Sequence, residues 1–186
     1  MGRVQDAVCD ALAAEISNRT EWDEPPAVFA VYHRGGRCHL GRLAIPDAIW
    51  ATGPPAGVLG ALADAAYTEA FMLQLLAPGE LHGAAFFTEI WMASARGADE
   101  AAGLTERAKA AGGVSKLPDR VEARSIWAVD RAGITYSAFQ TRGSDEVQRS
   151  VWYPKAGQPF TGRVPDALDK LVTAFLGVTL PTRGRS

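Results

Sequence analysis

Short β-forming segments joined by tight glycine turns are the feature that most restricts how this chain can fold. Residues 27–33 are apolar and rich in β-forming side chains, and residues 38–45 fit a second strand. The turn between them, residues 34–37, has the sequence Arg-Gly-Gly-Arg, and paired glycines supply the positive φ angles of a two-residue hairpin turn. Strands joined by such a turn pair antiparallel, so the sequence predicts an antiparallel sheet.

The rest of the chain adds strands and helices to this hairpin. A second hairpin is predicted at residues 121–142, with its turn at residues 130–133, Asp-Arg-Ala-Gly. Residues 81–93 form the longest apolar strand candidate, which we place centrally in the sheet, and residues 147–153 fit a further strand. Apolar residues at helical spacing predict helices at residues 3–18, at residues 56–76, and from Pro165 at a helix N-terminus to Gly177 as the stop.

The order of these elements predicts the fold class. An N-terminal helix, a hairpin, a central helix, further strands and a C-terminal helix give an α+β fold with a mainly antiparallel sheet of five to six strands and the three helices packed on it. The 186 residues fit one domain, which we place at residues 1–180 before a polar tail at 181–186. Residues 97–116 fit either a poorly anchored helix or a mobile loop. The order is similar to the profilin and roadblock type of sheet and compatible with the type III secretion chaperone type.

Charge is distributed unevenly along the chain. Residues 1–93 carry five basic and eleven acidic side chains, whereas residues 94–186 carry fourteen basic and ten acidic ones, within a total of −2. A basic half is one sign of a nucleic-acid-binding protein. The simpler interpretation is that the two halves pair within one fold, so that their charges largely cancel.

The sequence predicts a cytoplasmic location. The N-terminus contains acidic residues and lacks a continuous apolar segment, so it does not fit a secretory signal peptide. No run of about 20 apolar residues could span a membrane. Cys9 and Cys38 form no Cys-x-x-Cys motif and are expected to be free thiols in a reducing compartment.

Residues capable of acid–base chemistry or metal binding are few. His82 and Glu89 are seven residues apart, so on a regular strand they would point to opposite faces. His33 and His39 flank the first hairpin and are expected to be neighbours across it at its solvent end. With Cys38 they supply fewer than the four ligands of a structural zinc site. We expect no catalytic residue, no cofactor and no metal.

Nucleic-acid binding is the alternative function that the sequence leaves open. Basic residues recur through the second half with aromatic residues between them, which is typical of surfaces that stack single-stranded bases. The basic residues are Arg120, Arg124, Arg131, Arg142, Arg149, Lys155 and Arg163, and the aromatic ones are Trp127, Tyr136, Phe139, Trp152 and Tyr153. Strand alternation places Trp127 with Val129, so the aromatic side chains are expected on the core face, which weakens this interpretation.

The best candidate for a binding surface is the connector between the first helix and the first strand. It contains Trp22, Asp23, Glu24, Pro25 and Pro26. Tryptophan offers a large apolar area with an N–H donor, and two prolines hold the chain extended before any partner arrives. The structural alternative is that Trp22 folds over the sheet edge and Asp23 caps a turn.

Three segments of the chain carry a resemblance. Residues 22–26 match a W-D-x-P-P pattern, residues 82–91 form an apolar strand ending in Glu-x-Trp, and residues 121–142 form a hairpin with an A-V-D-R-x-G turn. In these features the chain resembles a family of small actinobacterial and actinobacteriophage proteins of unknown function. The resemblance implies a phage or actinobacterial accessory protein and no particular activity. We therefore expect a non-enzymatic interaction module that binds a protein partner or itself; a small-molecule-binding protein or enzyme is the third possibility.

Overall fold

Six antiparallel strands form a single sheet at the centre of the molecule, in the order β2-β1-β3-β4-β5-β6. The structure is a computed structural model, and it describes residues 2–65, 79–93, 98–154 and 162–178. The strands are β1 (Ala27–Arg34), β2 (Arg37–Arg42), β3 (Glu80–Met92), β4 (Val121–Asp130), β5 (Thr135–Thr141) and β6 (Gln148–Trp152). Both predicted hairpins are present, and Gly35 and Gly36 have the positive φ angles, 58° and 78°, expected of the first turn.

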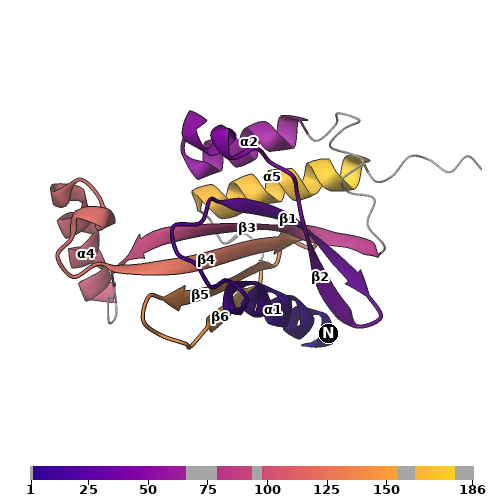
Figure 1. Ribbon diagram of the computed structural model, residues 1–186, viewed down its shortest axis with the longest axis horizontal. Coiled ribbons are helices and arrows are strands. Elements are labelled where there is room, and N and C mark those ends of the chain that lie inside the picture. Colours follow the sequence, from indigo (N-terminus) through magenta and orange to yellow (C-terminus); the bar gives the residue numbers. More distant parts are fainter. Residues whose placement is uncertain (1, 66–78, 94–97, 155–161, 179–186) are drawn as a thin grey trace, which may run out of the picture.

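Helices cover both faces of this sheet. The α-helices are α1 (Gly2–Ser17), α2 (Pro55–Ala65), α4 (Ala98–Ala111) and α5 (Arg163–Val178), and the short 3-10 helices are η1 (Asp47–Thr52) and η2 (Val114–Lys116). Figure 1 shows α1 against one face and α2 with α5 against the other, while α4 lies beyond the end of the sheet. The chain is thus a single α+β domain, as the order of predicted elements indicated.

Burial on both faces explains the apolar character of the central strands. On the α1 face, Val8, Leu12 and Ile16 recur at helical spacing and pack against Phe29 and Phe87. On the opposite face, the buried residues of α2 and α5 pack against alternate residues of β1, β3 and β4; they include Leu59, Leu168, Leu171 and Phe175. Each central strand therefore contributes successive side chains to two separate cores.

Some predicted boundaries differ from the structure. Gly177 was expected to follow the C-terminal helix, but α5 begins at Arg163 and continues through Gly177 to Val178. A glycine that keeps helical φ and ψ does not end a helix by itself, and Gly177 is not among the described residues with positive φ. The central helix is described over α2 only; the rest of the predicted helix, residues 66–76, lies outside the described residues, as does the predicted tail.

Of the two possibilities for residues 97–116, the structure shows the helical one over α4 and η2. None of the α4 side chains that the structure describes is buried. Asp119, just after η2, accepts both hydrogen bonds of a bidentate contact from Arg107, at 2.7 and 2.8 Å. The helix therefore forms largely by its own local interactions and contributes little to the two cores.

Candidate interaction surface

The connector between α1 and β1 is fastened to the sheet by a buried arginine. Arg124, on β4, is only 3% exposed. Its guanidinium group donates one hydrogen bond to the carbonyl oxygen of Arg19 and another to that of Glu21. A guanidinium group can serve two such acceptors at once because its donors lie in one rigid plane. The backbone just before the predicted binding motif is thereby fixed over the end of β4.

A carboxylate on the neighbouring strand holds the next two residues. Glu89, on β3, accepts hydrogen bonds from the backbone N–H groups of Asp23 at 2.8 Å and of Glu24 at 3.5 Å. The same carboxylate lies 3.8 Å from the Nε atom of Arg124. Asp23 has a φ of 66°, in the left-handed region that aspartate adopts more readily than most residues. The connector therefore has a defined conformation set by two charged side chains of the sheet.

Two guanidinium groups lie over the ring of Trp22. The guanidinium carbon of Arg124 is 4.3 Å from the centre of its ring, and that of Arg142 is 5.1 Å away. Cations above an aromatic face are attracted by the ring quadrupole. Arg142 in turn pairs with Glu122 of β4. Trp22 is thus half-buried on the α1 face of the sheet. This agrees in part with the alternative that Trp22 folds over the sheet, but a portion of the side chain stays accessible.

Arg19 joins the connector to α1 and to the core. It forms ion pairs with Glu15 of α1, at 2.8 Å, and with Glu24 of the connector. Its guanidinium carbon also lies 3.6 Å from the centre of the Phe87 ring. Pro25 stays exposed beside this network. Of the five predicted surface residues, Trp22, Glu24 and Pro26 are partly buried, whereas the side chains of Asp23 and Pro25 are exposed.

Trp91 extends this area with a side chain that sequence reasoning did not single out. It follows Glu89 by two residues on β3, so both point to the same face, and it lies opposite Glu122 in the register with β4. Trp91 is 42% exposed and has the Arg120 guanidinium group 4.8 Å from its ring centre. We call Trp22, Asp23, Trp91, Glu122 and Arg142 together the Trp22–Trp91 surface.

Acidic groups of this surface lie close together but already have cationic neighbours. One carboxylate oxygen each of Asp23, Glu89 and Glu122 lies within 4.8 Å of the others. Arg142 pairs with Glu122, and Arg124 approaches Glu89. A polar hollow of about 340 Å³ adjoins them, lined by Ser17, Arg19, Trp22, Arg124, Gln140, Gly143, Ser144 and Asp145. The guanidinium groups of Arg124 and Arg142 therefore supply the positive charge beside these carboxylates that a bound metal ion would otherwise supply.

The acid–base candidates lie at the other end of β3. The register between β1 and β3 shifts so that Val31 faces Gly83 and Tyr32 faces Leu81. His82 therefore has no partner residue in β1 and forms a bulge in β3. Its Nε2 atom lies 3.5 Å from Oδ2 of Asp130. Asp130 in turn accepts a hydrogen bond from Tyr136, which belongs to the core on the α1 side of the sheet, so His82 also lies on that side. The expectation that His82 and Glu89 point to opposite faces is corrected by this irregularity, because it assumed a regular strand. The two residues remain at opposite ends of β3.

Asp130 is a buried carboxylate with several donors. It accepts hydrogen bonds from the Tyr136 hydroxyl at 2.7 Å and from the backbone N–H groups of Ala132 and Ile134. Burial alone would raise the pKa of Asp130, but these donors together with His82 outweigh it and lower the pKa. Burial and the bond to Asp130 raise the pKa of Tyr136. The group fixes the turn after β4, and its nearest histidine is itself mostly buried.

The remaining metal and thiol candidates are not brought together. His33 pairs with Cys38 in the hairpin register and His39 pairs with Tyr32, so the two histidines are not cross-strand neighbours as predicted. The ring of His33 instead lies 6.1 Å from that of His82. Among the described residues, the three carboxylates above are the group found close enough to share a metal ion. Cys9 and Cys38 are free thiols, and burial raises the pKa of each.

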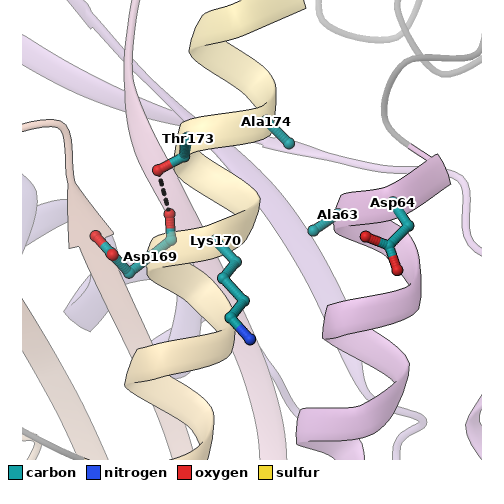
Figure 2. A pocket seen from close by; sticks show the side chains of 6 residues that line it. All are labelled: Ala63, Asp64, Asp169, Lys170, Thr173 and Ala174. Carbon is teal, nitrogen blue, oxygen red and sulfur yellow. Dashed lines mark hydrogen bonds between the residues drawn. The ribbon is translucent and has the colours of Figure 1, made fainter.

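A shallow groove lies between α2 and α5. Figure 2 shows Ala63 and Asp64 on α2 facing Lys170 and Ala174 on α5 across it. The groove measures about 240 Å³, and the Thr173 hydroxyl on its wall donates to the Asp169 carbonyl oxygen of its own helix. Its lining contains neither histidine nor cysteine.

Most arginines proposed for nucleic-acid binding have acidic partners. Arg124 approaches Glu89, and three further pairs are exposed on the surface: Arg131 with Glu80, Arg142 with Glu122, and Arg149 with Asp10. Three of these four acids belong to residues 1–93, so the two halves of the chain pair as the simpler interpretation predicted. Trp127 and Trp152 stack on each other on the sheet face opposite α1, with ring centres 5.5 Å apart.

Comparisons with known proteins do not identify the chain. No protein-family model, curated protein or solved structure matches it. The resemblance to actinobacterial and phage proteins and the likeness to profilin-type sheets therefore stay predictions. In the part of the chain that the structure describes, no helix combines the length and apolar character needed to cross a membrane.

Proposed function

We propose that this protein is a non-enzymatic protein-interaction module whose binding site is the Trp22–Trp91 surface. The observation that carries the proposal is the exposure of Trp91, 42%, beside a connector whose backbone is fixed by Arg124 and Glu89. Apart from Trp91, the large apolar side chains exposed among the described residues are Val121 and Tyr153. An exposed tryptophan next to guanidinium groups is therefore a distinguishing feature of this end of the sheet.

The composition and rigidity of the surface support a protein partner. Tryptophan and arginine are the residue types most enriched among those that dominate binding energy in protein interfaces. The connector is ordered without a partner, since Glu89 holds the backbone of Asp23 and Glu24 and two prolines follow. A partner would then lose little of its binding energy to ordering this segment. The proposed role is that of an accessory protein, which also fits the resemblance to actinobacterial and phage proteins.

Nucleic-acid binding is the second candidate, and the arginine content favours it. Its weakness is that Arg124, Arg131, Arg142 and Arg149 have acidic neighbours. A nucleic acid would have to compete with these carboxylates for each guanidinium group. Binding of that kind weakens steeply with added salt, because each phosphate contact releases counterions. Salt dependence therefore separates the two candidates.

Trp91→Ala tests the proposed surface. The purified protein and this variant are each immobilised and exposed to a nuclease-treated actinobacterial lysate, and retained proteins are identified by mass spectrometry. We expect one specific protein to be retained by the parent and at least tenfold less by Trp91→Ala, because a central tryptophan commonly contributes 2 kcal/mol or more, on the order of a 30-fold change in affinity.

Tyr153→Ala is the matched control, since Tyr153 is also an exposed aromatic residue, 59%, at the end of β6. Circular dichroism establishes that both variants are folded. Equal retention by the parent and Trp91→Ala would contradict the proposed surface. Retention of nucleic acid instead of protein from an untreated lysate, lost on raising the salt, would favour the second candidate.

A further inference from the structure

The outer edge of β2 is open to pairing. β2 pairs with β1 from Arg37 to Arg42 and is the first strand in the sheet order, so no described strand lies on its other side. Figure 1 shows it at the outside of the sheet. Its six residues contain no proline, and its pairing with β1 has no register shift. Proline and irregular pairing are two features that keep edge strands from pairing further, so β2 can accept another strand.

The hydrogen bonds of the hairpin show which groups of β2 point outward. The N–H group of Leu43 donates to the carbonyl oxygen of Val28 at 2.9 Å, and bonded and non-bonded pairs alternate along an antiparallel ladder. Counted back along β2, the residues that direct their N–H and C=O groups away from β1 are Cys38, Leu40 and Arg42. No backbone hydrogen bond from elsewhere in the described chain reaches these three residues. They form a regular row of donors and acceptors along the edge.

A second copy of β2, antiparallel and centred on Leu40, satisfies this whole row. Leu40 then pairs with Leu40 of the second copy, and Cys38 pairs with Arg42 on each side, with two hydrogen bonds in every pair. The two leucines meet on the α1 face, where the side chain already packs against the core. On the opposite face His39 meets Gly41. Like charges directly opposite each other destabilise a strand pair, and this register contains no such pair.

Other centres of pairing use the edge less completely. If the two strands were centred on His39, Arg42 would pair with Gly36 in the turn of the second copy. If they were centred on Gly41, Cys38 would pair with Ala44, beyond the end of β2. Pairing centred on Leu40 is therefore the register that matches all the outward groups of β2 with one another.

Charge at the two ends of β2 also favours a second copy. Antiparallel pairing brings the hairpin turn of one copy to the end of β2 in the other, next to the connector. The turn is flanked by Arg34 and Arg37, which are exposed and belong to none of the ion pairs among the described residues. The hollow at the other end of β2 is lined by three acidic and two basic side chains, which are Glu15, Glu21, Glu24, Arg19 and Arg42. Opposite net charges thus lie at the same end of the paired strands, which adds a long-range attraction.

We propose that two copies of this chain associate through β2, antiparallel about a two-fold axis at Leu40, so that their sheets become continuous. A two-fold interface requires a surface that is complementary to itself. β2 meets this requirement in its backbone groups, in its side-chain pairs and in the charges at its ends. The inference goes beyond the Trp22–Trp91 surface, because it uses other residues and can hold or fail whether or not Trp91 binds a partner.

Light scattering after size-exclusion chromatography measures the association. Over a series of protein concentrations we expect the mass to rise from the 19.8 kDa of one chain to twice that value. Leu40→Arg should weaken the dimer at least tenfold, because it places two guanidinium groups directly opposite each other. Leu104→Arg is the matched control: Leu104 is also partly buried but lies on α4, away from the edge, so this variant should dimerise like the parent. Thermal unfolding shows that both variants are folded.

An introduced thiol tests the register. Arg42→Cys places a thiol opposite Cys38 of the second copy, at the Cα separation of about 5.5 Å of a bonded antiparallel pair, which a disulfide can bridge. Glutathione disulfide supplies the oxidant and takes up the two electrons and two protons released as the bond forms. Within one chain the two positions are about 13 Å apart along the strand, so the bond joins two copies.

Peptide mapping by mass spectrometry identifies the linked cysteines. We expect position 42 to be joined to Cys38, and the link should disappear when Cys38→Ser is added. Arg37→Cys is the control, since its side chain lies on the other face of the same strand and should give no cross-linked dimer.

Three results would overturn the inference: a monomer up to millimolar concentration, a dimer that Leu40→Arg leaves unchanged, or equal cross-linking of Arg42→Cys and Arg37→Cys. A disulfide between two copies of Cys38 in the parent would overturn the register centred on Leu40. Equal loss of the dimer in folded Leu104→Arg would likewise show that the contact lies elsewhere than β2.

Discussion

Arg124 is the side chain through which the sheet controls the conformation of the connector. It is 3% exposed and donates to the carbonyl oxygens of Arg19 and Glu21, while Glu89 lies 3.8 Å from its Nε atom. A buried charge is tolerated only when acceptors and an opposite charge surround it. Trp22 also rests against this guanidinium group, so the binding surface depends on a residue that a partner would hardly touch.

Arg124→Ala is therefore expected to lower the free energy of unfolding by about 3 kcal/mol, since it leaves two carbonyl groups and the Glu89 carboxylate without their partner. Urea denaturation followed by circular dichroism measures the change. Arg107→Ala is the control: its pair with Asp119 is about half exposed on both sides, and such pairs contribute roughly 0–1 kcal/mol. Similar losses in the two variants would show that Arg124 does not anchor the connector.

Asp130 gives a pH-dependent prediction at the same scale. Its pKa is lowered in the folded protein, so ionised Asp130 stabilises the fold fully above the unfolded pKa, near 3.9, and less as the pH falls through the folded value. Asp130→Asn should cost about 1–3 kcal/mol at pH 5, and the difference from the parent should shrink at pH 3, because the carboxyl group of the unfolded chain then binds a proton while the lowered pKa of Asp130 in the fold opposes protonation. Urea denaturation at both pH values measures it, and a constant difference would contradict an ionised Asp130.

At the scale of elements, β3 combines a long apolar strand with a local irregularity. The register shift at Val31 and Tyr32 turns His82 toward Asp130, and Gly83 lies beside it. A Cβ atom at Gly83 would overlap the carbonyl oxygen of Val129 and lie 3.0 Å from the Cα atom of Asp130. Only glycine allows β4 to approach this closely, because backbone atoms cannot move aside as a flexible side chain can.

Gly83→Ala is thus expected to destabilise the protein by about 2 kcal/mol or more, because the strand pair must separate locally. Gly60→Ala in α2 is the control, since nothing lies within 4 Å of a Cβ atom added there. Alanine in a helix is favoured over glycine by roughly 0.5–1 kcal/mol, so this variant should be slightly more stable. Thermal unfolding of both variants measures the difference, and a neutral Gly83→Ala would mean that β3 and β4 are not this closely packed.

For the whole molecule, sheet topology decides which charges meet. Residues 1–93 and 94–186 carry opposite charge excesses, and β3 of the first part pairs with β4 of the second through most of its length. Glu80, Glu89 and Asp10 thereby reach Arg131, Arg124 and Arg149. Arg37 and Arg42 of the first hairpin lie on the edge strand β2.

The sequence alone was sufficient for the α+β class, both hairpins and the antiparallel order, because these depend on local turn chemistry and on the period of apolar residues. It also singled out Trp22 and its neighbours as a candidate surface. It could not show that Trp91 joins them, since that requires the register between β3 and β4. The orientation of His82 depends on an irregular pairing, and the two carbonyl groups that Arg124 binds lie more than 100 residues away in the chain. Contacts of this kind follow from which strands are neighbours and in what register, and only the tertiary structure decides that.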